Sequence, residues 1–349
     1  MRGSARHVWM KYAVAGAIAA LLLGGGYLWL NQRSPANRLG EACGGMLPVK
    51  DMLTLTGTTA SGFGGADLEL ESWHFNISDD VNEPDGLAAR CRANGVEVAI
   101  ETATGNHTPY GTYTFQQRDD VIPVPLGSGW SGFLVAERDD EIGASVLLDC
   151  ANWSRRQGSG ILVTTSNEVA DSGDASARAG LARLATRTAA RAARHTGCDA
   201  QPGNRVDRVD REDTTAPKPA DRAAGTCQSV QSRDEVRETA ARTSPVERCV
   251  LVGGLVLRAA YGPFARGDDD PYGGFGSPSG ENPTAAWGSA RCKGSFNAGL
   301  YWAAPADDDP SSARTPLTAT GRADLATFAG RSADRHGCSP PTLPEAPRK

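Results

Sequence analysis

The stretch AARHTGC (residues 192–198) and the stretch SADRHGC (residues 332–338) are two versions of one motif, and their relation decides the fold that we expect. Each lies at the end of a helix-like segment and finishes with a glycine and a cysteine. Leu184 and Leu325 lie at equal distances before His195 and His336, which places the two histidines at the same position of the motif. Glycine directly after a helical pattern is typical of a helix end. The motif therefore predicts two related domains that end alike.

The eight cysteines divide into the same two groups. In chain order they are Cys43, Cys91, Cys150 and Cys198, followed by Cys227, Cys249, Cys292 and Cys338. The second cysteine of each group follows an arginine and precedes a strand-like run, at residues 96–103 and 250–260. Four cysteines in the same order, with a matched terminal helix, indicate an internal duplication.

Disulfide bonds are the expected use of these cysteines, within each group of four. No CxxC pair occurs, and neither group has the spacing of a tetrahedral zinc site. An even number of cysteines in an exported protein favours disulfides. Each group allows three pairings, and the spacing does not choose among them.

An apolar run near the start predicts a membrane anchor. Residues 12–30 contain no charge and would form a helix of about 28 Å, enough to cross a hydrocarbon core of about 30 Å. Arg2, Arg6 and Lys11 precede the run, and this favours a cytoplasmic tail at residues 1–11 with the later domains outside the cell membrane. The alternatives are a cleaved signal peptide, which lacks a good cleavage site here, and a buried core helix.

The remaining chain predicts an α+β fold, in which each of two related domains is a small antiparallel sheet with a helix on one face. The first domain covers residues 41–198, with strand patterns at 68–77, 96–103, 133–137, 145–150 and 161–165, and helices at 47–53 and 178–195. Residues 199–225 form a linker with little to bury, and residues 226–338 form the second domain. In that domain we expect a helix at 234–242, strands at 250–260, 285–292 and 298–303, and a helix at 324–336. Residues 339–349 are expected to be a disordered tail.

No catalytic, cofactor-binding or metal-binding site is predicted. His195 and His336 have no acidic or cysteine partner at helical spacing, so each is expected to be a polar residue at a helix end. Acidic runs at 79–80, 119–120, 139–140, 268–270 and 307–309 lack the pattern of a calcium loop. The stretch VPLGSGW (residues 124–130) could be an exposed recognition edge, but a tight turn that buries Trp130 is the favoured interpretation.

The apolar segment, the tandem four-cysteine domains and the helix ending in an Arg-His-Gly-Cys motif resemble a group of actinobacterial, Streptomyces-type single-pass membrane proteins with tandem four-cysteine extracytoplasmic domains. The VPLGSGW stretch fits the same group. The resemblance covers most of the chain after residue 40. Because this group has no assigned activity, the resemblance implies an architecture and no functional residues.

The sequence therefore predicts a single-pass protein of the cell envelope that acts as a binding or interaction module and not as an enzyme. The net charge of −5 does not favour nucleic acid as a partner, so an envelope protein or ligand is expected beside the membrane. The alternative is an envelope hydrolase without a recognisable motif. A deep pocket lined by paired carboxylates, or by a histidine and a carboxylate, would favour that alternative.

Overall fold

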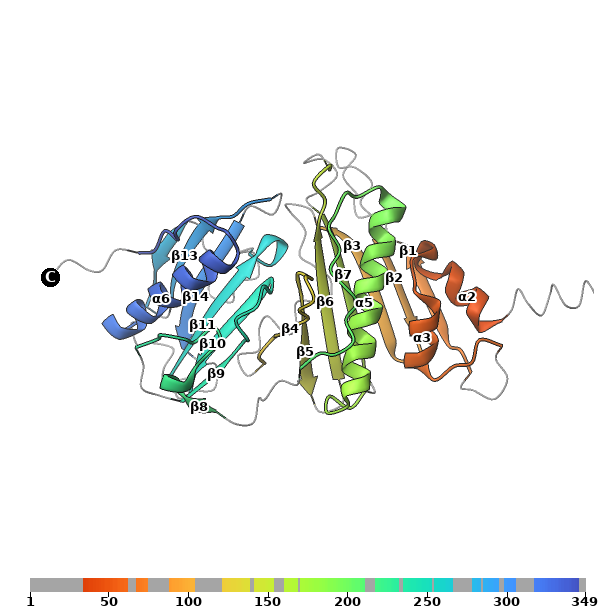
Figure 1. Cartoon of the computed structure of the whole chain (residues 1–349), viewed down its shortest axis with the longest axis horizontal. Helices are drawn as coiled ribbons and strands as arrows, with labels where there is room; N and C mark the ends of the chain where they lie inside the picture. Colours follow the sequence, from red (N-terminus) through yellow and green to blue (C-terminus); the bar gives the residue numbers. More distant parts are fainter. Residues whose placement is uncertain are drawn as a thin grey trace, which may run out of the picture.

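The protein is an α+β molecule with two antiparallel sheets, as expected, and each sheet has seven strands, more than the sequence predicted (Figure 1). The computed structural model describes residues 34–61, 67–74, 88–103, 121–138, 141–153, 160–168, 170–210, 217–231, 235–252, 254–265, 278–283, 285–294, 298–305 and 317–344. The predicted anchor at residues 12–30 lies outside this part of the chain. No helix within the described residues is long and apolar enough to cross a membrane.

The first half of the chain forms one sheet and its helices. The helices are α2 (Pro35–Glu41), α3 (Val49–Thr56) and α5 (Ala175–Thr196), with the 3-10 helix η1 (Ala42–Gly45). The strands are β1 (Leu70–His74), β2 (Ala88–Ala93), β3 (Val96–Ala103), β4 (Val124–Pro125), β5 (Gly132–Arg138), β6 (Glu141–Asp149) and β7 (Gly160–Asn167). They lie in the order β1-β2-β3-β7-β6-β5-β4.

The second half forms the other sheet. Its strands are β8 (Lys218–Pro219), β9 (Glu235–Glu238), β10 (Val246–Leu251), β11 (Leu255–Tyr261), β12 (Ser279–Glu281), β13 (Ala286–Arg291) and β14 (Ala298–Pro305). Its helix is α6 (Ala319–Arg335), and two 3-10 helices, η2 (Ala220–Arg222) and η3 (Gly262–Phe264), follow β8 and β11. The strand order is β12-β13-β14-β11-β10-β9-β8.

Six strands of each sheet share one topology. The order β1-β2-β3-β7-β6-β5 in the first sheet corresponds to β9-β10-β11-β14-β13-β12 in the second. In both halves the long helix follows the last of these strands. The remaining strands, β4 and β8, each extend one edge of a sheet, and among the described residues neither has a counterpart in the other half.

All eight cysteines form disulfides, which confirms their predicted use. The pairs are Cys43–Cys91, Cys150–Cys198, Cys227–Cys249 and Cys292–Cys338. In each half, one bond joins the segment before β1 or β9 to β2 or β10. The other joins the residue after β6 or β13 to a cysteine just beyond the end of the long helix. The first cysteine of each group thus pairs with the second, and the third with the fourth.

The helix ends correct the alignment of the two histidines. Gly197 and Gly337 both have a positive φ, and the amides of Cys198 and Cys338 donate to the carbonyl oxygens of Ala193 and Ala333. This geometry pairs Gly197 with Gly337, so Thr196, and not His195, corresponds to His336. The buried positions of α6 fall on the buried positions of α5 in the same alignment.

The central strands of each sheet are covered on both faces. Alternate side chains of the first sheet, such as Ile100 and Leu134, pack against α5, and those of the second pack against α6. The opposite faces of the two sheets pack on one another, and Phe133 of β5 meets Phe264 of η3 edge to face, with ring centroids 5.6 Å apart. Figure 1 shows the two sheets side by side at the centre, with α6 and α5 to either side.

Several predicted elements are wrong. Residues 234–242 were expected to be helical, but β9 forms there and pairs with β10, because strand pairing overrides a weak helical propensity. The single strand expected at 250–260 is a hairpin of β10 and β11. The expected linker buries Val206 and Val209, and part of it forms β8. Within the expected disordered tail, Thr342 is ordered and forms a β-bridge with Ser289 of β13.

The disulfide pattern makes a quantitative prediction. Replacing Cys150 and Cys198 together by Ser opens a loop closed over 48 residues, and should lower the free energy of unfolding by about 4 kcal/mol. Replacing Cys227 and Cys249, which close 22 residues, should cost about 3 kcal/mol. Urea denaturation measures both, and non-reducing peptide mass mapping tests the pairing. A bond joining the two groups of four would contradict the structure.

Candidate functional site

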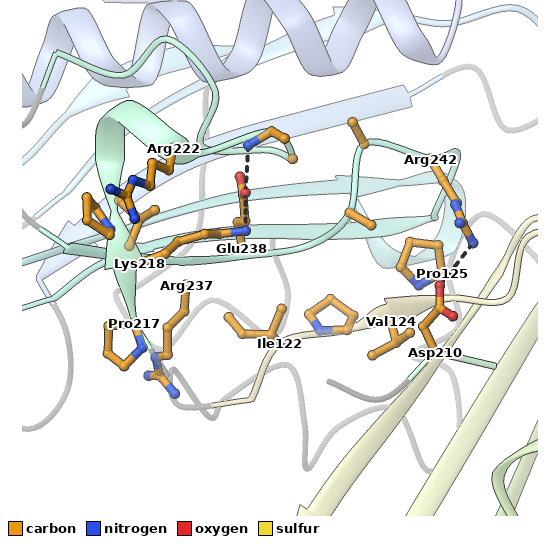
Figure 2. Close-up of a pocket in the computed structure, with 17 residues that line it drawn as sticks. Ile122, Val124, Pro125, Asp210, Pro217, Lys218, Arg222, Arg237, Glu238 and Arg242 are labelled. Carbon is orange, nitrogen blue, oxygen red and sulfur yellow. Dashed lines mark hydrogen bonds and ion pairs between the residues drawn. The ribbon is translucent and has the colours of Figure 1, made fainter. Parts of the chain in front are cut away.

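A groove of about 630 Å³ lies where an edge of the first sheet meets an edge of the second (Figure 2). Its described lining residues come from residues 122–125, from Asp210, and from within residues 217–225 and 236–242. These stretches include β4 and β8, the two strands for which the described residues of the other half show no counterpart. The groove is therefore built from parts that the shared six-strand topology does not include.

The segment that enters β4 is held by the second sheet. Arg248 of β10 donates from its guanidinium to the carbonyl oxygen of Val121 at 2.5 Å. The next residue, Ile122, is buried with Val250 and Val256 of β10 and β11. A charge-assisted bond and an apolar contact thus fix one wall of the groove.

The opposite wall depends on Glu238 of β9. Its carboxylate accepts hydrogen bonds from the backbone amides of Ala224 at 3.0 Å and Cys227 at 2.8 Å, and forms an ion pair with Lys218 at 2.7 Å. Its side chain is 2% exposed. Gly225 lets the backbone at this position lie close to the end of β9, because a Cβ there would lie 2.4 Å from the carbonyl oxygen of Thr239. Glu238 consequently acts as a support of the wall.

Residues 201–210 cross the first domain as a strap that ends in the groove. The indole Nε1 of Trp130 donates to the carbonyl oxygen of Asn204 at 2.7 Å, and the amide of Asn204 donates to that of Ser128 at 2.7 Å. Gly203 is required at this crossing, since a Cβ would lie 2.6 Å from both Ser128 and Trp130. The strap delivers Asp210 to the groove. Trp130 is 6% exposed, so the favoured interpretation of its turn is confirmed.

The charges of the groove are unevenly placed. Figure 2 shows Lys218, Arg222 and Arg237 gathered at one end, while Arg242 and Asp210 face each other at the opposite end. Arg242 and Asp210 form an ion pair of 3.5 Å. Among the described residues that line the groove, the first end has three cations and one carboxylate, that of Glu238, whereas the second end has one of each. The stretch between them is apolar and contains Ile122 and Val124.

Both strand edges that border the groove contain proline. Pro123 and Pro125 lie on the β4 side, and Pro217 and Pro219 on the β8 side. Proline has no backbone N–H to offer to an added strand, and natural proteins use it to block edge pairing. The groove can therefore recognise a ligand through side chains, but it is poorly suited to extending either sheet.

The structure places the two predicted histidines in different surroundings. His195 is exposed. His336 is not: its Nε2 lies 3.0 Å from Oε1 of Glu247, a fully buried carboxylate on β10, and its ring stacks on Tyr261 with centroids 3.6 Å apart. His336 is at the helix end, as expected, but it has an acidic partner that does not lie at helical spacing. The partner comes from a strand far away in the sequence, where helical spacing cannot reveal it.

Glu247 also binds two residues of α6. Its Oε2 accepts from Ser332 Oγ at 2.7 Å and from the guanidinium of Arg335 at 2.5 Å. Burial would raise the pKa of Glu247, but the hydrogen bonds from His336 and Arg335 and their positive charge outweigh it and lower that pKa. Burial and the charge of Glu247 raise the pKa of Tyr261, whose hydroxyl contacts Ser332 at 2.5 Å. These residues, the Glu247 cluster, fasten the end of α6 to the sheet.

The first domain has no equivalent of the Glu247 cluster. Ala89 corresponds to Glu247, Ala192 to Ser332, and Thr196 to His336 in the shared topology. The same fold therefore forms without these charges. Neither His336 nor Glu247 lines the groove, and their hydrogen bonds are directed at each other and at neighbouring side chains. The cluster has the character of a structural ion-pair network.

No group of three or more His, Cys, Asp or Glu residues in the described part of the chain could hold a metal ion. The five acidic runs fall outside the described residues. Comparisons of the chain with models of protein families, with curated proteins and with solved structures found no match.

The Glu247 cluster predicts a pH-dependent stability. Glu247→Gln should lower the free energy of unfolding by about 3 kcal/mol at pH 7, because Arg335 and His336 lose a buried counter-charge. Since the folded pKa lies below the ordinary value of 4.5, this contribution is complete above that value and is lost as the pH falls through the folded pKa. Urea denaturation between pH 7 and pH 3 measures it.

Glu97→Gln is the matched control. Glu97 pairs with Arg90 at 2.7 Å at the surface of the first sheet, so its loss should cost about 1 kcal/mol or less. A Glu247→Gln effect of the same size at pH 7 and pH 3 would show that the carboxylate charge is not its source.

Proposed function

We propose that this protein is a binding module of the cell envelope whose groove holds an extended segment, acidic at one end and apolar beyond it. One observation supports this most directly: among the described residues that line the groove, three cations and one carboxylate lie at one end, next to an apolar stretch. An acidic group would be attracted to the cationic end, and apolar side chains would lie along the stretch formed by Ile122 and Val124, which are themselves buried. The proline edges favour recognition through side chains over addition of a strand.

The chemistry of the lining residues favours binding over catalysis. The described residues that line the groove include no histidine, cysteine, serine, threonine or tyrosine. Its two carboxylates already have partners, Glu238 with Lys218 and Asp210 with Arg242. General acid–base or nucleophilic catalysis needs a group that is free to exchange a proton or attack. We therefore place a binding role before that of a hydrolase.

The proposed location is the outer side of the cell membrane, with residues 12–30 as a single span and residues 1–11 in the cytoplasm. Four disulfides support an oxidising compartment, since such bonds are rare in the cytosol. The resemblance to tandem four-cysteine membrane proteins agrees with this arrangement.

A peptide-binding experiment tests the groove. The full chain should bind a labelled peptide of sequence Glu-Glu-Leu-Pro-Leu-Pro in fluorescence polarisation. A peptide with Gln in place of both Glu should bind about tenfold more weakly or worse. Replacing Arg222 and Arg237 by Gln should weaken binding of the acidic peptide by a similar factor and leave binding of the Gln peptide unchanged.

The control variant removes two cations elsewhere, with Arg92→Gln and Arg331→Gln, and should bind the acidic peptide like the unaltered chain. Equal binding of the two peptides, or equal loss in both variants, would mean that overall charge and not the groove governs association, and would refute the proposal.

Lysine labelling tests the location. A membrane-impermeant amine reagent added to intact cells should modify Lys50, Lys218 and Lys293, and should reach Lys11 only after lysis. Labelling of Lys11 in intact cells would reverse the proposed orientation. A mature protein from which residues 1–11 are missing would replace the anchor by a cleaved signal peptide.

A further inference from the structure

A second, strongly basic depression lies on the first domain, away from the groove. Two adjoining hollows of about 290 and 360 Å³ run between α3 and α5 and share Lys50, Asp51 and Arg187. We call this surface the trough. Its cations are Lys50, Arg183, Arg187, Arg191, Arg194 and Arg205. Among the described residues lining it, Asp51 is the one carboxylate.

The sequence of α5 creates this stripe. The helix has 22 residues, with five arginines and no acidic residue. Arg183, Arg187, Arg191 and Arg194 recur at three- and four-residue spacing, so they share one face and span about 16 Å. Gly180 brings α3 close, because a Cβ there would lie 2.9 Å from Leu55. The close approach of α3 turns a basic helix face into a concave basic channel.

The fold does not require these charges. Like charges four residues apart on a helix are mildly destabilising. Asp51 pairs with Arg187 at 2.8 Å and offsets part of this repulsion. In the second domain the positions of Arg183, Arg187 and Arg194 are Ala323, Thr327 and Asp334, whereas the position of Arg191 is Arg331, and the same kind of helix forms. Structural contacts account for Arg187, which pairs with Asp51, and for Arg191, which donates to the carbonyl oxygen of Leu47. They do not account for Arg183 and Arg194.

We propose that the trough binds a linear polyanion whose repeating charges are phosphates. Guanidinium groups match phosphate oxygens in a two-pronged geometry, and five of the six cations are arginines. A row of cations in a channel fits a linear chain of charges better than it fits the flat surface of a bilayer. The trough and the groove have no lining residue in common, although Arg205 of the trough and Asp210 of the groove both lie on the strap, so the site does not rest on the proposed peptide ligand.

The test uses the full chain in a non-ionic detergent with fluorescently labelled inorganic polyphosphate as the probe. Binding should weaken steeply with salt. Replacing Arg183 and Arg194 by Gln should weaken it about tenfold or more and should reduce the slope of log K against log salt by about 1.5, for two lost phosphate contacts. Thermal unfolding of this variant should be unchanged or shifted upward, because two like charges are removed.

The matched control is the groove variant with Arg222→Gln and Arg237→Gln, which removes the same number of cations and should keep full polyphosphate binding. Equal loss in the two variants would overturn the proposal in favour of non-specific charge attraction. Binding to vesicles of phosphatidylglycerol but not to polyphosphate would overturn it in favour of a membrane surface. If the chain binds polyphosphate but not the acidic peptide, the proposed peptide-binding groove is refuted and the polyphosphate site is not.

Discussion

The structure depends on the packing of two sheets against each other. Each sheet buries one face under its helix and the other against its neighbour, so apolar side chains are needed at successive positions of the central strands. Burial on both faces explains runs such as residues 144–148, in which no position is exposed. The same contact brings one edge of each sheet together, and the guanidinium of Arg248 ties the chain entering β4 to the second sheet. The groove exists because of this contact.

The two halves share a framework and differ in their charges. Both have six strands in one order, a long helix and two disulfides at corresponding places. The Arg stripe occurs only on α5, whereas the Glu247 cluster occurs only under α6. The same framework forms with either set of charged residues. We therefore relate the arginines of α5 to the proposed ligand and the Glu247 cluster to the attachment of α6. Comparison of the two halves thus separates the residues that the fold requires from those that it does not require.

Much of the fold was accessible from the sequence, but little of the candidate site was. Alternating apolar residues at 96–103 and helical spacing at 178–195 predicted β3 and α5, because local periodicity indicates the type of element, although β3 is buried on both faces. The groove combines residues 122–125, Asp210 and Arg242, which no local pattern connects. Val124 and Pro125 belong to the VPLGSGW stretch. The sequence predicted the burial of Trp130 in that stretch, but it did not predict a groove. The pairing of Glu247 with His336 was missed for the same reason.

The sequence by itself determined the α+β class, the division into two four-cysteine groups and the use of cysteines in disulfides, because composition, periodicity and cysteine number act locally or through simple chemistry. Only the tertiary structure decided the disulfide pairing, the one-residue shift between His195 and His336, and the meeting of the two sheet edges. Those features depend on which distant segments share a surface. Strand pairing and face-to-face packing select that surface through contacts summed over the whole chain, and no single segment encodes it.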